Sequence, residues 1–490
     1  INGEWEYVDD GISITNATGT YNDSALFQLI TLDSSKQYKA TIDVSSISGS
    51  LQVYTGLFSA GFTVNTTGIK SFILDLTSLG GRFNLLPGNG SDVVIKSFSL
   101  VEVIGDRPRL DYDPLNPTCP HLLLEPQSTN LVTFSEDFSG YITNNSSVSS
   151  NVISSPDGSI NASKLVENTA TAEHTIQKSV SVTSGNAYSI SVFVKKDEIS
   201  SVQFGFTGSN FASPTRSIFD IENGTITTNV SNTASIQNYG NGWYKLKVTN
   251  TTNATGTAML ILQSIKSGQA NYAGDGVSGF YMWGLQWEQQ GFATSYLKTA
   301  GTTITRAAET CNNSKPSVNS TEGVLYAEIN IPVNIADNVN LAISNGTNTE
   351  IVKFIYLVST STFKGEMQGS GNTKSISDTS FVLGSYSKVA VLYKSGEFKL
   401  YVNGSQIGST ITSHTLPTGL NEVAFDRGDG LVVFYGKVKG LAVYNEALSE
   451  SQLMQLTGVT ASSIYNNFVT RTASFTVEAL NEVKKVIDNL

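Results

Sequence analysis

The chain has 490 residues, of which 30 are Lys or Arg and 41 are Asp or Glu, so its formal net charge at pH 7 is −11. An acidic chain without a basic run is a poor partner for nucleic acid or an anionic membrane surface, because both attract positive charge. Its 23 Phe and 20 Tyr argue against disorder, and no apolar run reaches the roughly 20 residues that cross a bilayer.

Apolar and polar residues alternate along most of the chain, and this period favours strands over helices. The length gives a prior of about three domains at roughly 150 residues each. We therefore predict an all-β chain of three tandem antiparallel β-sandwich domains with a short C-terminal helix.

The first block covers residues 1–104. A strand is expected where Tyr38, Ala40, Ile42 and Val44 alternate with polar residues. Since the chain starts at Ile1 without Met, we interpret it as a processed product or a fragment. Residues 105–120 hold four prolines and predict an extended connector outside any sheet, because proline lacks a backbone donor.

The second block covers residues 121–310 and shows the same alternation. Tyr188, Ile190, Val192 and Val194 predict one strand, and Leu246 and Val248 are expected to point inward from another. Three tryptophans in this block, Trp243, Trp283 and Trp287, are assigned to packing. Residues 32–38 and 182–188 both place a polar turn before a Tyr that opens a strand, which indicates one architecture used twice.

The third block covers residues 316–458. It contains an Asn403-Gly404 pair, which favours a tight hairpin turn, and a short helix that begins at the N-cap Ser449 and ends at Gly458. The tail, 459–490, is predicted to hold a second helix with an apolar seam at 3-4-3 spacing. This helix packs either on its own domain or on other copies, as in a homotrimer.

Cys119 and Cys311 bracket the second block. If the first and last segments of this block lie side by side, the two thiols can form a disulfide; the alternative is two unrelated small core residues.

Catalysis requires positioned acids, bases or nucleophiles, and the sequence shows no such motif. The three histidines lie outside any zinc-binding pattern, and Glu322 and Glu328 lack the acidic cluster of a glycosidase. We expect no enzyme and no cofactor. The loop carboxylates Asp426 and Asp429 leave Ca²⁺ open as an alternative, although two carboxylates fall short of the six to eight oxygens that this ion takes.

Sugar binding requires less, because a pyranose ring stacks on a flat aromatic side chain while polar neighbours satisfy its hydroxyls. The residues that we single out for this role are Trp5, Tyr7, Tyr54, Tyr401 and Asn403. The alternative for each of them is a structural role, since aromatic residues usually fill cores.

Several motifs follow one another in order through the second block, and together they resemble a module of bacteriophage tail-fibre and virion-decoration proteins. The matching runs are Leu-Leu-Leu-Glu-Pro-Gln-Ser-Thr-Asn-Leu at 122–131, Phe134-Ser135-Glu136-Asp137-Phe138, Ser155-Pro156-Asp157-Gly158, Gly242-Trp243-Tyr244, Gln286-Trp287-Glu288, Thr294-Ser295-Tyr296 and Thr305-Arg306-Ala307-Ala308. Such modules resemble carbohydrate-binding jelly rolls. The first block is similar to them only in its periodicity.

The third block resembles a laminin-G or concanavalin A-like domain in its hairpin at 398–404 and in its final segment at 435–448. These resemblances imply jelly-roll and concanavalin A-like sandwiches in an extracellular protein of the virion surface, on a head or tail fibre. They imply adhesion to host surface polysaccharide, with other virion proteins as partners. A purely structural virion component, a secreted bacterial adhesin or accessory module, and a concanavalin-like lyase remain alternatives.

Overall fold

The computed structural model describes residues 5–9, 11–20, 24–29, 37–55, 62–74, 82–103, 109–114, 116–212, 215–229, 233–311 and 314–458. Almost all described elements are antiparallel strands, which confirms the predicted fold class. The chain forms two compact units, one built on Ile1–Gly105 and one on Asp106–Thr476. The helix predicted within 459–490 lies outside the described residues. Among those described, no helix has the length and apolar character needed to cross a lipid bilayer.

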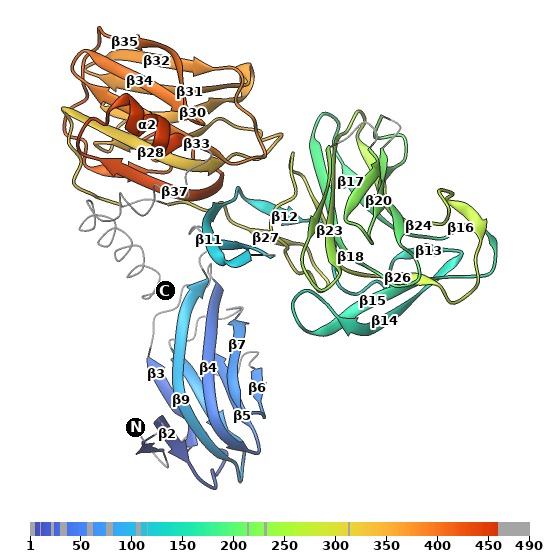
Figure 1. Cartoon of the computed structure of the whole chain (residues 1–490). Coiled ribbons are helices and arrows are strands. Elements are labelled where there is room, and N and C mark those ends of the chain that lie inside the picture. The colour runs from blue at the N-terminus through green and yellow to red at the C-terminus, as the bar shows by residue number, and fades with distance from the viewer. Residues whose placement is uncertain are drawn as a thin grey trace. The chain divides into compact units, whose positions relative to one another are not determined.

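The first unit is a sandwich of two sheets, in which β4 and β9 form the long central pair (Figure 1). One sheet has the order β1(Glu6–Val8), β2(Gly11–Ile14), β9(Asp92–Val103), β4(Gln37–Ser48), β7(Gly68–Leu74). The other has the order β3(Leu26–Leu29), β8(Arg82–Pro87), β5(Leu51–Thr55), β6(Phe62–Val64). The alternation of Ala40, Ile42 and Val44 places all three in the core, as predicted.

The second block folds as a larger sandwich. One sheet has the order β14(Ser146–Ser154), β15(Ile160–Glu167), β26(Gly279–Glu288), β18(Ala187–Lys196), β23(Trp243–Thr251), β22(Thr233–Asn238). The other has the order β13(Ile142–Asn144), β17(Thr175–Val182), β24(Gly256–Ile265), β19(Ser201–Thr207), β20(Arg216–Asp220), β21(Thr225–Thr228). Two short pairs complete it: β12(Ser128–Asn130) with β27(Ile304–Arg306), and β16(Thr171–Glu173) with β25(Asn271–Ala273).

These two sandwiches share one strand order. The sheets β2-β9-β4-β7 and β3-β8-β5-β6 correspond in chain order to β15-β26-β18-β23 and β17-β24-β19-β20. Both are jelly rolls, in which eight strands form two Greek keys over two sheets. The weak repeat in the sequence therefore reflects one architecture used twice. In the second copy Tyr188, Ile190 and Val192 lie in the core, as predicted.

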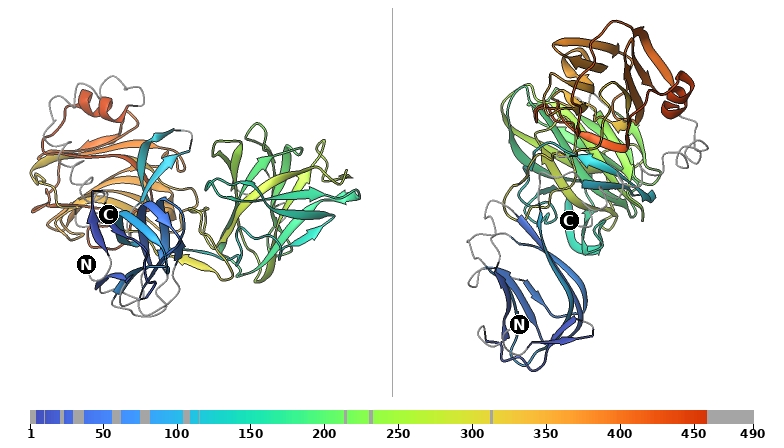
Figure 2. Two further views of the ribbon diagram at one scale, coloured as in Figure 1. Left: turned by 90° about the horizontal axis from the view of Figure 1, so that it is seen from below. Right: turned by 90° about the vertical axis from the view of Figure 1, so that its left-hand side faces the viewer.

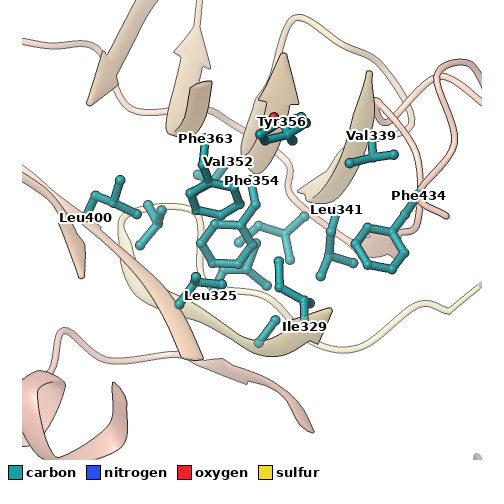
Figure 3. Close-up of a cluster of buried hydrophobic side chains, with 14 of the residues drawn as sticks. Leu325, Ile329, Val339, Leu341, Val352, Phe354, Tyr356, Phe363, Leu400 and Phe434 are labelled. Carbon is teal, nitrogen blue, oxygen red and sulfur yellow. The ribbon is translucent and has the colours of Figure 1, made fainter. Parts of the chain in front are cut away.

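The third sandwich packs a seven-stranded sheet on a five-stranded one. The larger sheet has the order β10(Arg109–Asp113), β11(Asn116–Leu124), β37(Gly436–Tyr444), β28(Glu322–Asn330), β33(Ser387–Lys394), β34(Glu397–Val402), β35(Ser405–Ile411). The smaller has the order β32(Asn372–Asp378), β31(Thr362–Gly369), β30(Ile351–Leu357), β29(Val339–Ser344), β36(Glu422–Ala424), and a 3-10 turn, Val358–Thr360, follows β30. Figure 3 shows the apolar side chains of both sheets meeting between them, with Phe354 and Phe363 stacked.

Two local signals in this block are confirmed. Asn403 and Gly404 both have positive φ, 48° and 87°, as the tight turn between β34 and β35 requires. The helix α2(Glu450–Thr457) starts at Ser449, whose side chain forms a capping box with Gln452. Figures 1 and 2 show α2 on the outer side of the sandwich, where Leu453 is buried in a small apolar cluster.

The proline-rich stretch differs from the prediction of a connector outside any sheet. Its residues form the β10–β11 hairpin, which extends the seven-stranded sheet. Only Leu122–Leu124 pair with β37, whereas Pro117 and Pro120 lie in the part of β11 that faces the edge strand β10. Proline is tolerated near a sheet edge, because the N–H group that it lacks has no neighbouring strand to donate to there. The number of prolines alone does not show where they lie in a sheet, so the prediction of a connector outside any sheet is wrong.

Candidate functional site

Three of the rings singled out for sugar stacking are buried, and this corrects their assignment. Trp5, Tyr54 and Tyr401 are 4%, 3% and 0% exposed. The indole Nε1 of Trp5 donates to the carbonyl of Ser24 at 2.7 Å, and Tyr401 packs in the cluster beneath α2. A buried ring offers no face to a saccharide, so these residues hold their own domains together.

The two other predicted residues occupy surface positions in different units. Tyr7 is 81% exposed on β1, and its role in binding stays a prediction. The Oδ1 of Asn403 accepts a hydrogen bond from the backbone N–H of Lys388 at 2.9 Å, so this side chain supports the hairpin turn. Within the second unit, the ring of Tyr401 is buried and Asn403 supports its turn, so these two residues offer no joint surface to a ligand.

The carboxylates of the 426–429 loop have protein partners. Asp426 accepts from the backbone N–H of Gly428 at 2.6 Å, and Asp429 pairs with Arg427 at 2.7 Å. Within the described ranges, no group of three His, Cys, Asp or Glu residues is arranged to hold a metal ion.

Of the two alternatives for the cysteines, a disulfide or two unrelated core residues, Cys311 fits the second, because it is a free cysteine in the structure. Its side chain packs against the core of the third sandwich, and burial raises the pKa of its thiol to about 11. The side chain of Cys119 lies outside the described residues. Cys311 therefore packs on the third sandwich as a small apolar residue, which is a common role of a free cysteine.

The motifs that carried the resemblance meet in a buried polar network, which we call the motif network. It begins at Glu125, immediately after β11. The Glu125 carboxylate accepts from the backbone N–H of Ser295 at 2.9 Å and forms ion pairs with Arg306 and Arg109. Its backbone N–H donates to Glu309 at 2.7 Å. Residues nearly 200 positions apart in sequence are thereby joined where the jelly roll begins and ends.

A second carboxylate, Glu288 at the end of β26, extends the motif network. It is fully buried and accepts from the hydroxyl of Ser128 at 2.5 Å and from the backbone N–H of Thr294 at 3.0 Å. The Nζ of Lys245 donates to the carbonyl of Thr294 at 3.1 Å. Because the Glu288 carboxylate receives these donors from segments far apart in sequence, it joins the start and the end of the jelly roll.

The third part of the motif network joins the 134–138 motif to the 294–296 motif. Tyr296 donates to Glu136 at 3.0 Å, and its hydroxyl lies 2.6 Å from that of Ser135. The amide of Asn161 also donates to Glu136, at 3.1 Å, from the strand after the 155–158 turn. These motifs therefore serve architecture, which the sequence analysis did not foresee.

Beside the motif network lies a pocket of about 200 Å³ within the second unit, between the jelly roll and the third sandwich. Its apolar lining is Leu123, Leu124, Phe292, Pro332 and Val333, and its polar lining includes Glu125, Ser235, Lys247, Thr249, Asn330 and Lys437.

The 291–293 loop ties the jelly roll to the third sandwich at this pocket. Phe292 packs against the core of that sandwich. A Cβ on Gly291 would lie 2.1 Å from the carbonyl oxygen of Asn334, so only glycine permits this approach.

Lys247 is the most perturbed group of the pocket wall. Burial, followed by the positive charges of Lys245 and Lys437, lowers the pKa of Lys247 to about 7, while Glu125 and Asp111 oppose the shift. Its Nζ donates to Gln237 at 3.1 Å. Across the pocket, the Nζ of Lys437 lies 2.7 Å from a carboxylate oxygen of Asp111. A site with an ammonium group, hydroxyls, an amide and an apolar wall can bind a small polar ligand.

This pocket is not predicted by any motif in the sequence. The one local signal was the alternation of Lys245 and Lys247 with Leu246 and Val248, which places two lysines on the outer face of a strand in a chain with few charges. The opposite wall comes from residues between 330 and 437, and no local pattern connects it to β23.

Comparison with known proteins gives one family match. Residues 325–454 match the model of the concanavalin A-like lectin/glucanases superfamily, within the block that resembled a laminin-G or concanavalin A-like domain. None of the curated proteins compared with the chain matches it.

Solved structures show distant likenesses. The carbohydrate-binding module CBM40 of the Ruminococcus gnavus IT-sialidase, bound to α2,6-sialyllactose, is 20% identical with a TM-score of 0.25, covering 29% of this chain and 85% of the module. Domains LG4-5 of the mouse laminin α1 chain are 9% identical with a TM-score of 0.22, covering 58% and 88%. A Trypanosoma rangeli sialidase is 11% identical with a TM-score of 0.23, covering 74% and 57%.

Proposed function

We propose that this protein binds glycans through the pocket between its second and third sandwiches. The proposal rests on one observation: side chains of a jelly roll and of a concanavalin A-like sandwich together line a single pocket that is both polar and apolar. Phe292 and Pro332 offer an apolar wall to the C–H face of a sugar. Ser235, Thr249 and Asn330 offer hydroxyl and amide groups to its own hydroxyls.

We further propose that the protein acts on the surface of a virion, as a fibre or decoration protein that adheres to host polysaccharide. The motif run between residues 122 and 308 supports this role by resemblance to such proteins. One pocket of this size binds weakly, and display in several copies, such as a homotrimer, raises the overall avidity. We propose no enzymatic activity.

A second candidate is a purely structural virion component. It is favoured by the burial of Trp5, Tyr54 and Tyr401, which leaves their rings in cores, and by the motif network, which joins consecutive sandwiches. In this case the pocket is a seam between domains.

A glycan array with the whole chain, followed by adsorption to whole cells, tests the proposal. Ser235 is exposed on the edge strand β22, so Ser235→Trp places an indole over the pocket without entering a core. The matched control is Ser149→Trp on β14, an exposed serine on the opposite edge of the same sheet.

We expect glycan binding by the wild type and the control, and its loss in Ser235→Trp. Absence of binding to any glycan contradicts the proposal, and so does unchanged binding by Ser235→Trp. Detection of the protein in purified particles separates the virion role from a secreted adhesin, and a reducing-end assay exposes a lyase or hydrolase.

A further inference from the structure

We infer that the pocket is selective for acidic saccharides and that it places their carboxylate or sulfate group beside Lys247. This inference rests on the glycan-binding function proposed above and specifies the class of ligand.

The position of Lys247 supports the inference first. Lys247 on β23 lies directly opposite Ser235 on β22, and Thr249 is the next outward residue of the same strand. An ammonium group and two hydroxyls that line one pocket are a donor set for the oxygens of an anion. The amide of Asn330 and the ammonium of Lys437 line the facing wall.

The carboxylates around the pocket are already engaged. Glu125 is held by Arg306, Arg109 and the backbone of Ser295. Asp111 lies 2.7 Å from the Nζ of Lys437 and 3.0 Å from the Nε2 of His121. In the part of the chain that the structure describes, Lys247 forms no ion pair, and its Nζ is bonded to the neutral amide of Gln237. An anion from outside would complete the coordination of this ammonium group.

The charge balance of the wall also favours an anion. The positive groups that act on Lys247 are Lys245 from its own strand and Lys437 from β37, and the negative groups are Glu125 after β11 and Asp111 from β10. Glu125 is paired with Arg306 and Arg109, and Asp111 is paired with Lys437, so neither acid is left to pair with Lys247. A half-enclosed site strengthens its attraction for an anion, because water screens it less.

Binding is then expected to depend on pH near neutrality. Burial and the two neighbouring lysines hold the pKa of Lys247 near 7, so its ammonium form is present at pH 6 and largely lost at pH 8.5. Carboxylate and sulfate groups on sugars stay ionised over this range, so the protein side determines the change. Losing one charge-assisted hydrogen bond weakens affinity by about tenfold or more.

Isothermal titration of the whole chain with three oligosaccharides of equal length tests the inference. The probes are a galacturonic acid tetrasaccharide, its neutral methyl ester and a sulfated galactan tetrasaccharide. We expect binding of an acidic probe at pH 6 with at least about tenfold weaker affinity at pH 8.5, and little binding of the neutral ester. The first and third probes distinguish a carboxylate from a sulfate ligand.

Two variants keep the test independent of folding. Lys247→Met removes the ammonium and should abolish the pH dependence, and Ser235→Asp introduces a carboxylate opposite Lys247 at an exposed position and should repel the anion. Lys364→Met on β31, outside the pocket lining, is the matched lysine control.

Two outcomes overturn the inference but leave the glycan-binding function standing. One is equal binding of the neutral and acidic probes. The other is binding of the acidic probes that Lys247→Met does not change. Failure to bind any glycan, on the array and in the titration, overturns both.

Discussion

The motif network and the pocket lie next to each other and share Glu125, yet they differ in how many protein donors or acceptors their charged groups contact. In the network, carboxylates such as Glu288 receive several donors and are excluded from water. In the pocket, Lys247 and Ser235 have few partners and remain accessible. A carboxylate that receives several protein donors holds chain segments together, whereas an ammonium group that donates to one neutral amide keeps capacity for a ligand.

This difference shows that motifs that carry a resemblance need not be the residues that line a pocket. The runs around Glu125, Glu288, Ser295 and Arg306 contact one another in the motif network. The residues that line the pocket belong to none of these runs, apart from Glu125 and its two preceding leucines.

The largest effect is expected from Glu125→Ala. Removing this carboxylate leaves the buried Arg306 guanidinium without its ion-pair partner, and breaking a buried pair in this way costs about 3–5 kcal/mol. Chemical denaturation followed by fluorescence measures the loss. The control is Glu173→Ala, an exposed glutamate on β16. A loss below about 1 kcal/mol would mean that the network does not stabilise the fold.

Glu288→Gln is expected to destabilise by less, about 1–3 kcal/mol, because the side chain keeps its shape while one buried charge-assisted acceptor is lost. The backbone N–H of Thr294 then faces a weaker acceptor. Thermal unfolding compared with the control Gln290→Glu, which changes charge nearby at a surface amide, measures the effect. Equal melting temperatures for Glu288→Gln and wild type would contradict it.

The pH dependence of the free energy of unfolding tests whether Lys247 in the pocket has a lowered pKa. The pKa of Lys247 falls to about 7 on folding, whereas an unfolded lysine titrates near about 10.4. Between these values the unfolded chain binds more protons, so stability rises with pH, by at most about 1.4 kcal/mol per pH unit from this group. Lys247→Met should reduce the slope measured by urea denaturation between pH 7.5 and 9, while Lys364→Met keeps it. Identical slopes in all three proteins would mean that Lys247 titrates normally.

The smallest effect is expected from Ser235→Asp in the absence of ligand. A carboxylate directly opposite Lys247 creates a cross-strand ion pair, which is worth about 0.2–1 kcal/mol and raises the pKa of Lys247. Denaturation at pH 7 should therefore show a slight gain, and Ser149→Asp on β14 should show none. A clear loss of stability would indicate that the position is more enclosed than the structure shows.

Local features of the fold were predictable from the sequence. The alternation of apolar and polar residues predicts which face of the strands around Ile190 and Leu246 points into the core, because side chains in a strand alternate between two faces. The turn at Asn403 and the cap at Ser449 followed from backbone preferences of single residues. The three tryptophans of the second block are buried, as predicted.

Features that depend on distant segments were not predictable. The sequence predicts Trp5, Tyr54 and Tyr401 as surface rings for sugar stacking, and only the packed structure shows that these rings are buried. The pocket combines β22 and β23 with residues after Asn330, and the shifted pKa of Lys247 arises from this combination.

The β10–β11 hairpin has a consequence for how the protein is made and handled. β11 precedes the second jelly roll in sequence and pairs with β37, near the other end of the described chain. The last sheet is therefore completed only after the intervening jelly roll has been synthesised. A truncated chain that begins at residue 325, where the family match begins, lacks this hairpin and presents β37 as a bare edge. Such edges recruit strands from other molecules, so we expect the truncated product to aggregate where a chain beginning before Arg109 stays dispersed.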